Sequence, residues 1–583
     1  MPEGRLHGAP SAGPDLTTAM KRSHSWGRFP QIGVARVVPI ARQSAPLRID
    51  KFDCPMLAFS QSNVVPMHAW TIILKLGFML KREKHYLLTF MGLIGLYLIL
   101  TISLALTSQP RPDEGYFANP AFNLVTKGSM GTSVIEPAGS FLIGTKPGVV
   151  LSGINERTYW IMPLHILAQA AWYKMVGFSF LSLRMLSTIW GLIALFSWFV
   201  MIKALSGNRQ VAILASFFIA SDYIFVTSAS FGRMDMMCAA LGFAAMALYL
   251  RFRERNLTLA VLGSQTLLAA GGFTHPNAVM AFASVLFLTI YFDRSLLTWW
   301  HLVIAVIPYL LGGVGWGIYI LQSPADFLAQ FGANAKLNRV PGFISPWTAL
   351  KQEIMVRYLP VFGFDSSSTG LARLKILILL TYAGAVGCTI SMSGIRQHKG
   401  YLALLGIGAI YFAIQTFFNA KLNFYLVHTM PILAAILAVS IHWCWRHHKV
   451  PTWLLILVTF SFMTFQIGWI AYGIVQNHYQ KWYIPVVDYL KPTIDTTNLI
   501  VGSAEIGIGL GFPNSFVDDV GVGYNSGRKP DIIVISNDYA YAFNHLHANQ
   551  PWIYQYIIGL LDERYYRVYT NPYYQIYVSL SSH

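Results

Sequence analysis

RPDEGYFANP (residues 111–120) follows directly on the first long apolar run of the chain, at about 86–107. It places two adjacent carboxylates, Asp113 and Glu114, where a membrane-spanning segment would leave the bilayer. Ionisable residues at a membrane edge often only end one helix or cap the next, so the pair has a structural interpretation as well as a functional one. The surrounding sequence is needed to choose between them.

Composition places the chain among polytopic membrane proteins. Hydrophobic residues make up 55% and charged residues only 11% of its 583 residues, and the mean hydropathy is +0.48. The net charge of +17 comes mainly from short Lys and Arg clusters between apolar runs, as membrane orientation requires, so we expect no nucleic-acid partner. The pattern predicts about eleven membrane-spanning helices, at about 86–107, 181–203, 211–228, 236–250, 257–273, 277–292, 299–321, 374–393, 401–418, 426–443 and 453–475.

The basic clusters also orient the chain. Lys81, Arg82 and Lys84 precede the first run, so we expect the N-terminus in the cytoplasm, because basic residues in short loops resist translocation. The cluster RFRER (251–255) is cytoplasmic only if the apolar stretch 158–176 is not a span. That stretch mixes aromatic and polar residues with apolar ones, which favours a helix lying in the membrane interface. The C-terminus is then extracytoplasmic.

Three segments follow from these patterns. Residues 1–78 are rich in Arg, Ser, Pro and Gly, so we expect a disordered extension, and the signal-anchor pattern from Met79 marks a candidate native start. Residues 79–476 form the transmembrane domain, with a long extracytoplasmic loop at 108–180. Residues 477–583 contain the strand patterns NLIVGSAE, SFVDDVG, DIIVIS and YYQIYVSL and the helical stretch PWIYQYIIGLLDER, which predict a small soluble α/β domain.

Polar residues at other outward ends of the apolar runs are candidates for a site. SFGRMDMMC (230–238) puts Arg233 and Asp235 on the side of Asp113. The two charges simply pair with each other on the structural interpretation. On the functional interpretation, two separated carboxylates converge on one cavity.

Two more positions lie on the same side. His275 follows an apolar run, where a helix cap is the commoner role of a lone His. Lys421, with Tyr425 nearby, is a basic residue away from the cytoplasmic face, where it either snorkels or meets an anionic partner. Cations there suit a lipid phosphate, and a carboxylate suits removal of a proton from a hydroxyl group.

Together these segments resemble the GT-C membrane glycosyltransferases, specifically glycosyltransferase family 39 and its relatives, which include protein O-mannosyltransferases and lipid A aminoarabinose transferases. The resemblance lies in an ordered set: DEGYFANPAFNLVTKG after the first run, MPLHILAQAAWYKMVGFSFLSLRMLSTIWGLIAL at 162–195, FGRMDMMCAALGFAAMALYLRFR at 231–253, and KLNFYLVHTMPILAAIL at 421–437. It implies a mainly α GT-C fold with a small extracytoplasmic α/β domain at the C-terminus.

The resemblance implies catalytic roles for the carboxylates. Asp113 would be the general base, and Asp235 would line the same cavity. Glu114 would support Asp113 or help to hold a divalent metal in members that use one. Relatives carry an acidic and basic pair just before the interface helix, for which Glu156 and Arg157 stand in here, so Glu156 is a second candidate metal ligand; no other cofactor is expected.

The resemblance also implies a set of residues that bind the substrate or its lipid phosphate. Arg233 would position Asp235, and Lys421 would contact the phosphate. His275 lies near the place where many relatives have a Lys. Arg157 and Tyr425 complete the candidate set.

The expected reaction is a single inverting displacement on the extracytoplasmic side. The expected donor is a sugar carried on a polyprenyl phosphate, and the acceptor hydroxyl belongs to a lipid, a glycan or a protein. Two other classes remain open: a flippase or transporter of lipid-linked sugars, which would need ionisable or broken helices near the membrane midplane, and a non-catalytic assembly subunit. We expect a multi-pass protein of a bacterial inner membrane.

Overall fold

The computed structural model describes residues 67–139, 149–338, 345–365, 370–418, 420–494 and 498–580. Residues Ile73–His583 form one compact unit. Helix α1 begins at Met67, so the segment predicted to be disordered, 1–78, is helical over its last part. Residues 1–66 of that prediction lie outside the described residues.

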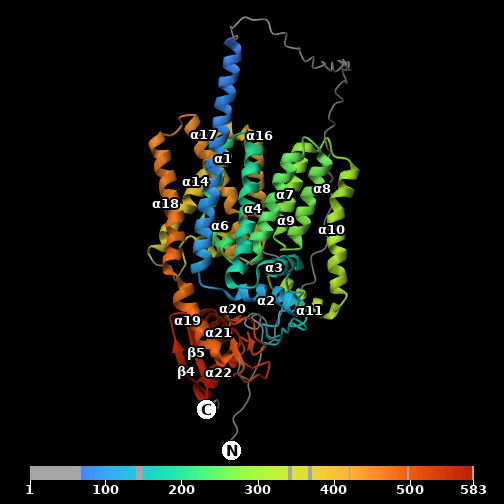
Figure 1. Ribbon diagram of the computed structural model, residues 1–583, viewed down its shortest axis with the longest axis vertical. Helices are drawn as coiled ribbons and strands as arrows, with labels where there is room; N and C mark the ends of the chain where they lie inside the picture. Colours follow the sequence, from blue (N-terminus) through green and yellow to red (C-terminus); the bar gives the residue numbers. More distant parts are fainter. Residues whose placement is uncertain are drawn as a thin grey trace, which may run out of the picture. The chain divides into compact units, whose positions relative to one another are not determined.

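Every apolar run that the sequence assigned to a membrane span is helical. The corresponding helices are α1 (Met67–Thr107), α4 (Phe180–Ser206), α5 (Arg209–Ser221) with α6 (Tyr223–Ala229), α7 (Met234–Phe252), α8 (Leu257–Gly272), α9 (Ala278–Asp293), α10 (Trp299–Ile320), α14 (Ile376–Ser391), α16 (Lys399–Phe417), α17 (Met430–Arg446) and α18 (Thr452–Gln476). They run roughly parallel to one another as the bundle in Figure 1.

Helix length refines the predicted number of spans. Within the described residues, eight helices are long and apolar enough to cross a membrane, and a ninth span results if α5 and α6 count as one. Helices α8 and α9 have 16 residues each, which is about 24 Å of helix against about 30 Å of hydrocarbon. These two short helices account for the difference from the predicted eleven.

The ninth span is bent by 64° between α5 and α6. Asp222 lies at the bend, and its carboxylate accepts hydrogen bonds from the backbone N–H groups of Ile224 and Phe225 at 3.1 and 2.9 Å. Tyr382 and Gln466 donate to the other oxygen at 2.8 and 2.9 Å. This buried carboxylate is therefore fully occupied in capping α6.

Two helices lie across the ends of the bundle on the side of the C-terminal domain (Figure 1). They are α2 (Pro112–Lys127) and α3 (Pro163–Val176). With 14 residues, α3 is too short to span a membrane, in agreement with the prediction that 158–176 is not a span. The remaining helical segments of the bundle are α11 (Pro324–Asn338), α12 (Pro346–Gln352), η1 (Glu353–Tyr358), α13 (Leu359–Val361), η2 (Ala372–Lys375), α15 (Ser393–Arg396) and η3 (Asn423–His428).

Helix α7 occupies the centre of the bundle. It packs against α4, α8 and α9, and nearly all of its side chains are buried. Trp198 of α4 meets Phe243 of α7 edge-on, with ring centroids 5.0 Å apart. Because α7 begins at Met234, its rigid packing fixes the position of Arg233 and Asp235.

The C-terminal domain follows η4 (Tyr479–Tyr483), α19 (Ile484–Leu490) and η5 (Lys491–Thr493). Its sheet has the strand order β2-β1-β3-β5-β4. Strands β1 (Ile500–Gly502), β2 (Phe516–Val517) and β3 (Ile532–Ser536) are parallel, whereas β4 (Tyr565–Thr570) and β5 (Tyr574–Ser579) join antiparallel. Helices α20 (Ala504–Leu510), α21 (Asn537–Asn549) and α22 (Pro551–Arg564) complete the predicted α/β domain. The four predicted strand patterns contain β1, β2, β3 and β5, and the predicted helical stretch is α22; β4, α20 and α21 were not predicted.

The first loop of the transmembrane domain is joined directly to this C-terminal domain. Ile135 forms a parallel bridge with Asp518, and the Tyr116 hydroxyl of α2 donates to the Asp518 carboxylate at 2.8 Å. Gly115 lies so close to α20 that a Cβ atom there would stand 2.3 Å from the Ala504 carbonyl oxygen. A glycine in DEGYF is therefore required by packing, and the C-terminal domain supports the helix that carries Asp113.

Candidate active site

Helix α2 begins so as to hold the acidic pair in place. Pro112 is its first residue, where the missing N–H costs nothing. Glu114 at the third position accepts a hydrogen bond from the backbone N–H of Arg111 at 3.2 Å. Carboxylates are also stabilised here because the helix dipole is positive at its N-terminus.

Glu114 forms a buried ion pair with Arg184 of α4. Arg184 Nε and an Nη atom donate to the two carboxylate oxygens at 2.9 and 2.7 Å, and both side chains are fully buried. The backbone N–H of Gly232 donates to the same carboxylate at 2.8 Å, and Arg184 also donates to the carbonyls of Ala105 and Ser108 at 2.7 and 3.0 Å. Both Glu114 oxygens are thus engaged by donors of the protein, an arrangement that suits the supporting role beside Asp113 better than metal binding.

Asp113 and Asp235 are brought together by Arg233. The guanidinium of Arg233 pairs with Asp113 through an Nη atom and with Asp235 through Nε, at 2.9 Å. Asp235 is 2% exposed, whereas the Asp113 side chain is 42% exposed. The predicted convergence of the two carboxylates is therefore present, and Asp113 is the one that an external hydroxyl group can reach.

Aromatic rings hold the Arg233 guanidinium in this position. It lies 3.9 Å from the ring centroid of Phe424 and 5.4 Å from that of Phe117. The guanidinium of Arg111 also lies 5.3 Å from the ring centroid of Phe424. Phe424 therefore separates two cations, one of which is bound between carboxylates.

Polar side chains surround Asp235 in the interior. Within the described part of the chain, several of their buried atoms have no hydrogen-bond partner: Asp235 Oδ1, both ring nitrogens of His165, both side-chain amide atoms of Gln169, His428 Nε2 and Asn277 Nδ2. Burial lowers the pKa of His165 to about 4, although the charge of Asp235 opposes this shift. Buried polar groups without partners are costly, so this cluster is built for polar groups that a ligand or bound water supplies.

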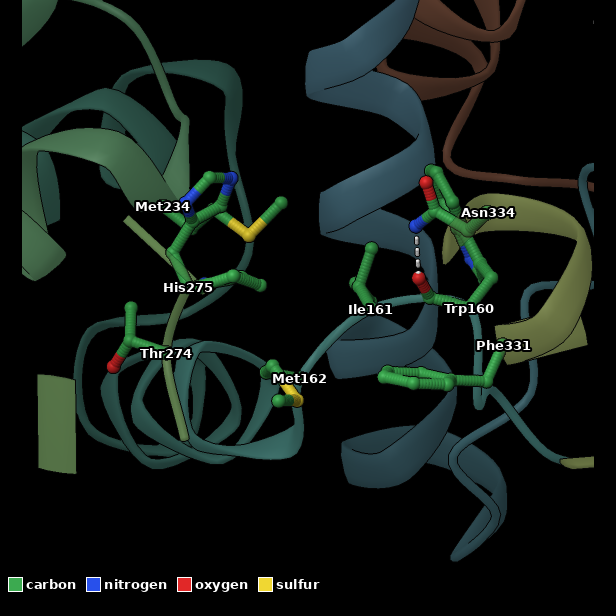
Figure 2. Close-up of a pocket in the computed structure, with 9 residues that line it drawn as sticks. Trp160, Ile161, Met162, Met234, Thr274, His275, Phe331 and Asn334 are labelled. Atoms are coloured by element: carbon green, nitrogen blue, oxygen red, sulfur yellow. Dashed lines mark hydrogen bonds between the residues drawn. The ribbon is translucent and has the colours of Figure 1, made fainter. Parts of the chain in front are cut away.

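A small pocket of about 30 Å³ lies beside this cluster. Figure 2 shows His275 and Met234 on one wall and Trp160, Ile161 and Phe331 on the other. Asn334 of α11 donates a hydrogen bond to the Trp160 carbonyl behind the second wall. His275 thus lines a pocket, and its ring meets Tyr425 edge-on at 5.3 Å between centroids.

An apolar groove lies next to this pocket. It has a volume of about 570 Å³ and is formed by α3, α8 and α10, with Pro163, Phe273 and Trp316 among its lining residues. Pro163 and Phe273 are chain neighbours of Met162 and Thr274 in the wall of the smaller pocket. An apolar surface suited to a hydrocarbon chain therefore lies next to the pocket that contains His275.

Lys421 does not reach this pocket in the way the sequence suggested. Its Nζ donates to Glu353 Oε2 at 2.9 Å and to the carbonyls of Gln415 and Thr416 at 3.2 and 2.7 Å. These three bonds use all the N–H groups of an ammonium. Burial lowers the pKa of Lys421, and the bond to Glu353 opposes that shift. The expected phosphate contact is therefore replaced by a structural ion pair, in which Arg357 also binds Glu353 at 2.7 Å.

Glu156 and Arg157 also lie apart from the cluster. They pair with each other at 3.5 Å with side chains 71% and 35% exposed, and Arg157 donates to Gln322 beyond the end of α10 at 3.3 Å. Nowhere in the described ranges do three or more His, Cys, Asp or Glu side chains gather as a metal site. Glu114 is held by Arg184 and Glu156 lies in a surface pair, so these two residues do not fit the predicted metal site.

Several residues of the cluster were missed by the sequence reasoning. Arg184 and His165 lie inside the second quoted segment, and His428 lies inside the fourth. Arg184 carried a signal, since it is a charged residue inside an apolar run and such residues need a partner. His165 and His428 gave no separate signal, because a His near the end of an apolar run usually caps a helix or packs in an interface.

Comparisons with known proteins support the fold. No protein-family model matches the chain, and no curated protein sequence matches it significantly. The crystal structure of ArnT from Cupriavidus metallidurans bound to undecaprenyl phosphate is similar, with a TM-score of 0.57 and 14% identity over 84% of this chain and 98% of that one. Its apo form gives 0.57 and 14% over 86% and 99%.

A more distant likeness is to the apo oligosaccharyltransferase of Archaeoglobus fulgidus, with a TM-score of 0.49 and 11% identity over 84% of this chain and 74% of that one. The chain therefore has the GT-C membrane fold that the sequence resemblance implied, including the small C-terminal domain. At this level of identity, the likeness extends to the fold and leaves the reaction to be argued from the site.

Proposed function

We propose that the chain is a membrane glycosyltransferase that moves a sugar from a polyprenyl phosphate to an acceptor hydroxyl group. The observation that carries the proposal is Arg233 bridging a half-exposed Asp113 and a buried Asp235 beside a cluster of unpartnered polar groups. A charged bridge of this kind is more than helix termination needs, because Glu114 alone already caps α2. The undecaprenyl phosphate bound by ArnT supports the donor class.

Each residue of the site has a place in the proposed reaction. Asp113 accepts the proton of the acceptor hydroxyl group, whose oxygen then attacks the anomeric carbon. The bond from that carbon to the phosphate oxygen breaks, and the polyprenyl phosphate leaves with inversion at the sugar. Arg233 positions both carboxylates and would supply a positive charge beside the reacting groups.

The buried polar cluster would bind the sugar. His165, Gln169 and Asn277 offer unpartnered donors and acceptors that match sugar hydroxyl groups. His275 lines the pocket next to the apolar groove of α8 and α10. The lipid chain of the donor would lie in this groove, because its walls are apolar and chain neighbours line the groove and the pocket.

The site would lie on the extracytoplasmic side of the membrane. Helix α7 begins at the site and ends at the basic cluster around Arg251 and Arg253, and basic clusters of this kind stay in the cytoplasm. The N-terminus would then be cytoplasmic and the C-terminal domain extracytoplasmic. We propose a bacterial inner membrane as the location, on the likeness to ArnT.

Replacement of Asp113 by Asn tests the proposal. Loss of a positioned base lowers a rate about 10²–10⁴-fold, so consumption of radiolabelled polyprenyl-phosphate sugars in membrane extract should fall by that factor. Glu156→Gln is the matched control, since it removes an exposed carboxylate from the same loop. Full activity of Asp113→Asn would refute the base, and donor movement across vesicles without sugar transfer would favour a flippase. A chain that consumes no donor in any preparation would be a non-catalytic subunit.

A further inference from the structure

A second cavity includes Arg111, the residue that precedes α2, in its wall. It has a volume of about 470 Å³ and is lined by residues from the end of α1, the loop before α2, α6, η2, α18 and the C-terminal domain. Arg111 contacts the rings of Phe231 and Phe424, each at 5.3 Å, and both Arg111 and Phe231 line the cavity. The wall of the cavity therefore includes a residue, Arg111, that is two positions before Asp113 in the chain.

The ionisable side chains that give this cavity its charge are basic. Arg111, Lys375 and His478 line it, and none of its lining residues within the described ranges is acidic. Among those same ranges, neither Arg111 nor Lys375 forms an ion pair. A cavity wall of this composition is complementary to an anion.

Aromatic rings hold Lys375 without using its donors. Its Nζ lies 4.2 Å from the ring centroid of Trp469 and 5.4 Å from that of Tyr223. Ring faces attract a cation, but they do not replace hydrogen-bond acceptors for its three N–H groups. A partly buried ammonium of this kind lacks a counter-charge, and an anion in the cavity would supply it.

Part of the cavity lining is apolar. Leu104 of α1 and Ile470 and Gly473 of α18 line it, and both helices are among those long enough to span the membrane. A ligand that matches the whole cavity has an acidic head near Lys375 and Arg111 and a hydrocarbon part against α1 and α18. These are the properties of a membrane lipid with a phosphate head.

We infer that this cavity, named here the Lys375 cavity, binds the phosphate head of an anionic membrane lipid. The site is distinct from the pocket that contains His275, because the two share no lining residue. The role of the lipid, though not its binding, rests on the proposed function. A head group held by Arg111 lies next to Asp113, which is where an acceptor has to bind if Asp113 is the base.

Binding of dioctanoyl phosphatidic acid to the purified full-length chain in detergent tests the inference. Dioctanoylglycerol, which lacks the phosphate, and inorganic phosphate, which lacks the chains, are the comparison ligands. Tight binding of phosphatidic acid with weak binding of both others is expected. Equal binding of dioctanoylglycerol would overturn the inference, and binding of inorganic phosphate as tightly as of the lipid would assign the site to a soluble anion and overturn it as well.

Lys375→Met identifies the site, because methionine keeps the unbranched apolar side chain and removes the charge. We expect at least tenfold weaker binding of phosphatidic acid. Arg373→Met is the matched control, since Arg373 is an exposed cation in the same segment, η2, and does not line the cavity. An unchanged affinity in Lys375→Met, or an equal loss in Arg373→Met, would place the lipid elsewhere.

Two further measurements cover the case in which Lys375→Met does not fold and separate this inference from the proposed function. If Lys375→Met does not fold, Arg111→Met and the salt dependence of the wild-type affinity give the same information, since binding to these cations must weaken as ionic strength rises. Asp113→Asn should bind phosphatidic acid as the wild type does. Lipid binding that requires Lys375 in a chain without transferase activity would leave this inference standing and remove only the proposed function.

Discussion

Glu114→Gln should destabilise the protein strongly without acting on the chemistry. The substitution leaves Arg184 fully buried and without its counter-charge. Removing one partner of a buried ion pair costs about 3–5 kcal/mol, because the remaining charge stays out of water. The Gln side chain has one carbonyl oxygen to replace two carboxylate oxygens that accept from Arg184, Arg111 and Gly232.

Equilibrium unfolding of the detergent-solubilised protein, followed by tryptophan fluorescence, measures this loss. Glu254→Gln is the control, because Glu254 forms an exposed pair with Arg253 at 3.1 Å and such pairs contribute about 0–1 kcal/mol. The double variant Glu114→Gln with Arg184→Met should recover part of the loss, since it removes the unpaired charge. The difference between the stability loss of the double variant and the sum of the losses of the two single variants then gives the coupling energy of the pair.

The result that would refute this reasoning is a Glu114→Gln protein as stable as the wild type but inactive. Glu114 would then act in the reaction, as the sequence resemblance implied. A stability loss of the expected size, with activity kept by the folded fraction at low temperature, supports the positioning role.

Three more predictions concern the surroundings of the site. Gly115→Ala should weaken the packing of α2 against the C-terminal domain by about 1–3 kcal/mol, because its Cβ would stand 2.3 Å from the Ala504 carbonyl oxygen. Faster proteolysis between the bundle and the domain would show this loss, and an unchanged rate would contradict it. Burial raises the pKa of Asp518 to about 7 and that of Glu505 to about 8, so the native state keeps protons that the unfolded chain releases near pH 4. The stability of the domain should therefore fall as the pH rises from about 4 to about 8, with a shallower slope in Asp518→Asn; unfolding midpoints across this range measure it, and a stability that rises with pH would exclude it. Lys421→Met should lower the thermal midpoint while the affinity for the polyprenyl-phosphate donor stays the same, and a selective loss of donor affinity would restore its predicted phosphate contact.

Much of the fold could be predicted because membrane helices and basic clusters leave strong signals. Long apolar runs gave the helices, and charge alone showed that 158–176 is not a span, which its 14-residue helix α3 agrees with. The bounds of α8 and α9 were predicted to within one residue at each end, but with 16 residues each they fall short of the length that a membrane span needs. In the C-terminal domain, β4 was missed because YYRVYT lies beside a helical stretch with no turn residue between them.

The site was predicted in part, for a physical reason that differs between residues. Asp113 and Asp235 lie at helix starts that face the same side, so topology brought them together. Lys421 was assigned to a phosphate because it is a basic residue away from the cytoplasmic face, and the roles of Lys421 and Glu114 followed from the family resemblance. Their partners, Glu353 and Arg184, lie 68 and 70 residues away, a separation at which one sequence gives no pairing signal.

The support of α2 by the C-terminal domain has a consequence for synthesis. Tyr116 and Asp518, which share a hydrogen bond, are 402 residues apart in the chain. The whole bundle is therefore synthesised before the surface of the C-terminal domain against which the DEGYF segment of α2 packs. Contacts so distant in sequence form late. A chain whose translation stops before residue 500 would have every apolar helix in the bilayer and yet no correctly seated Asp113.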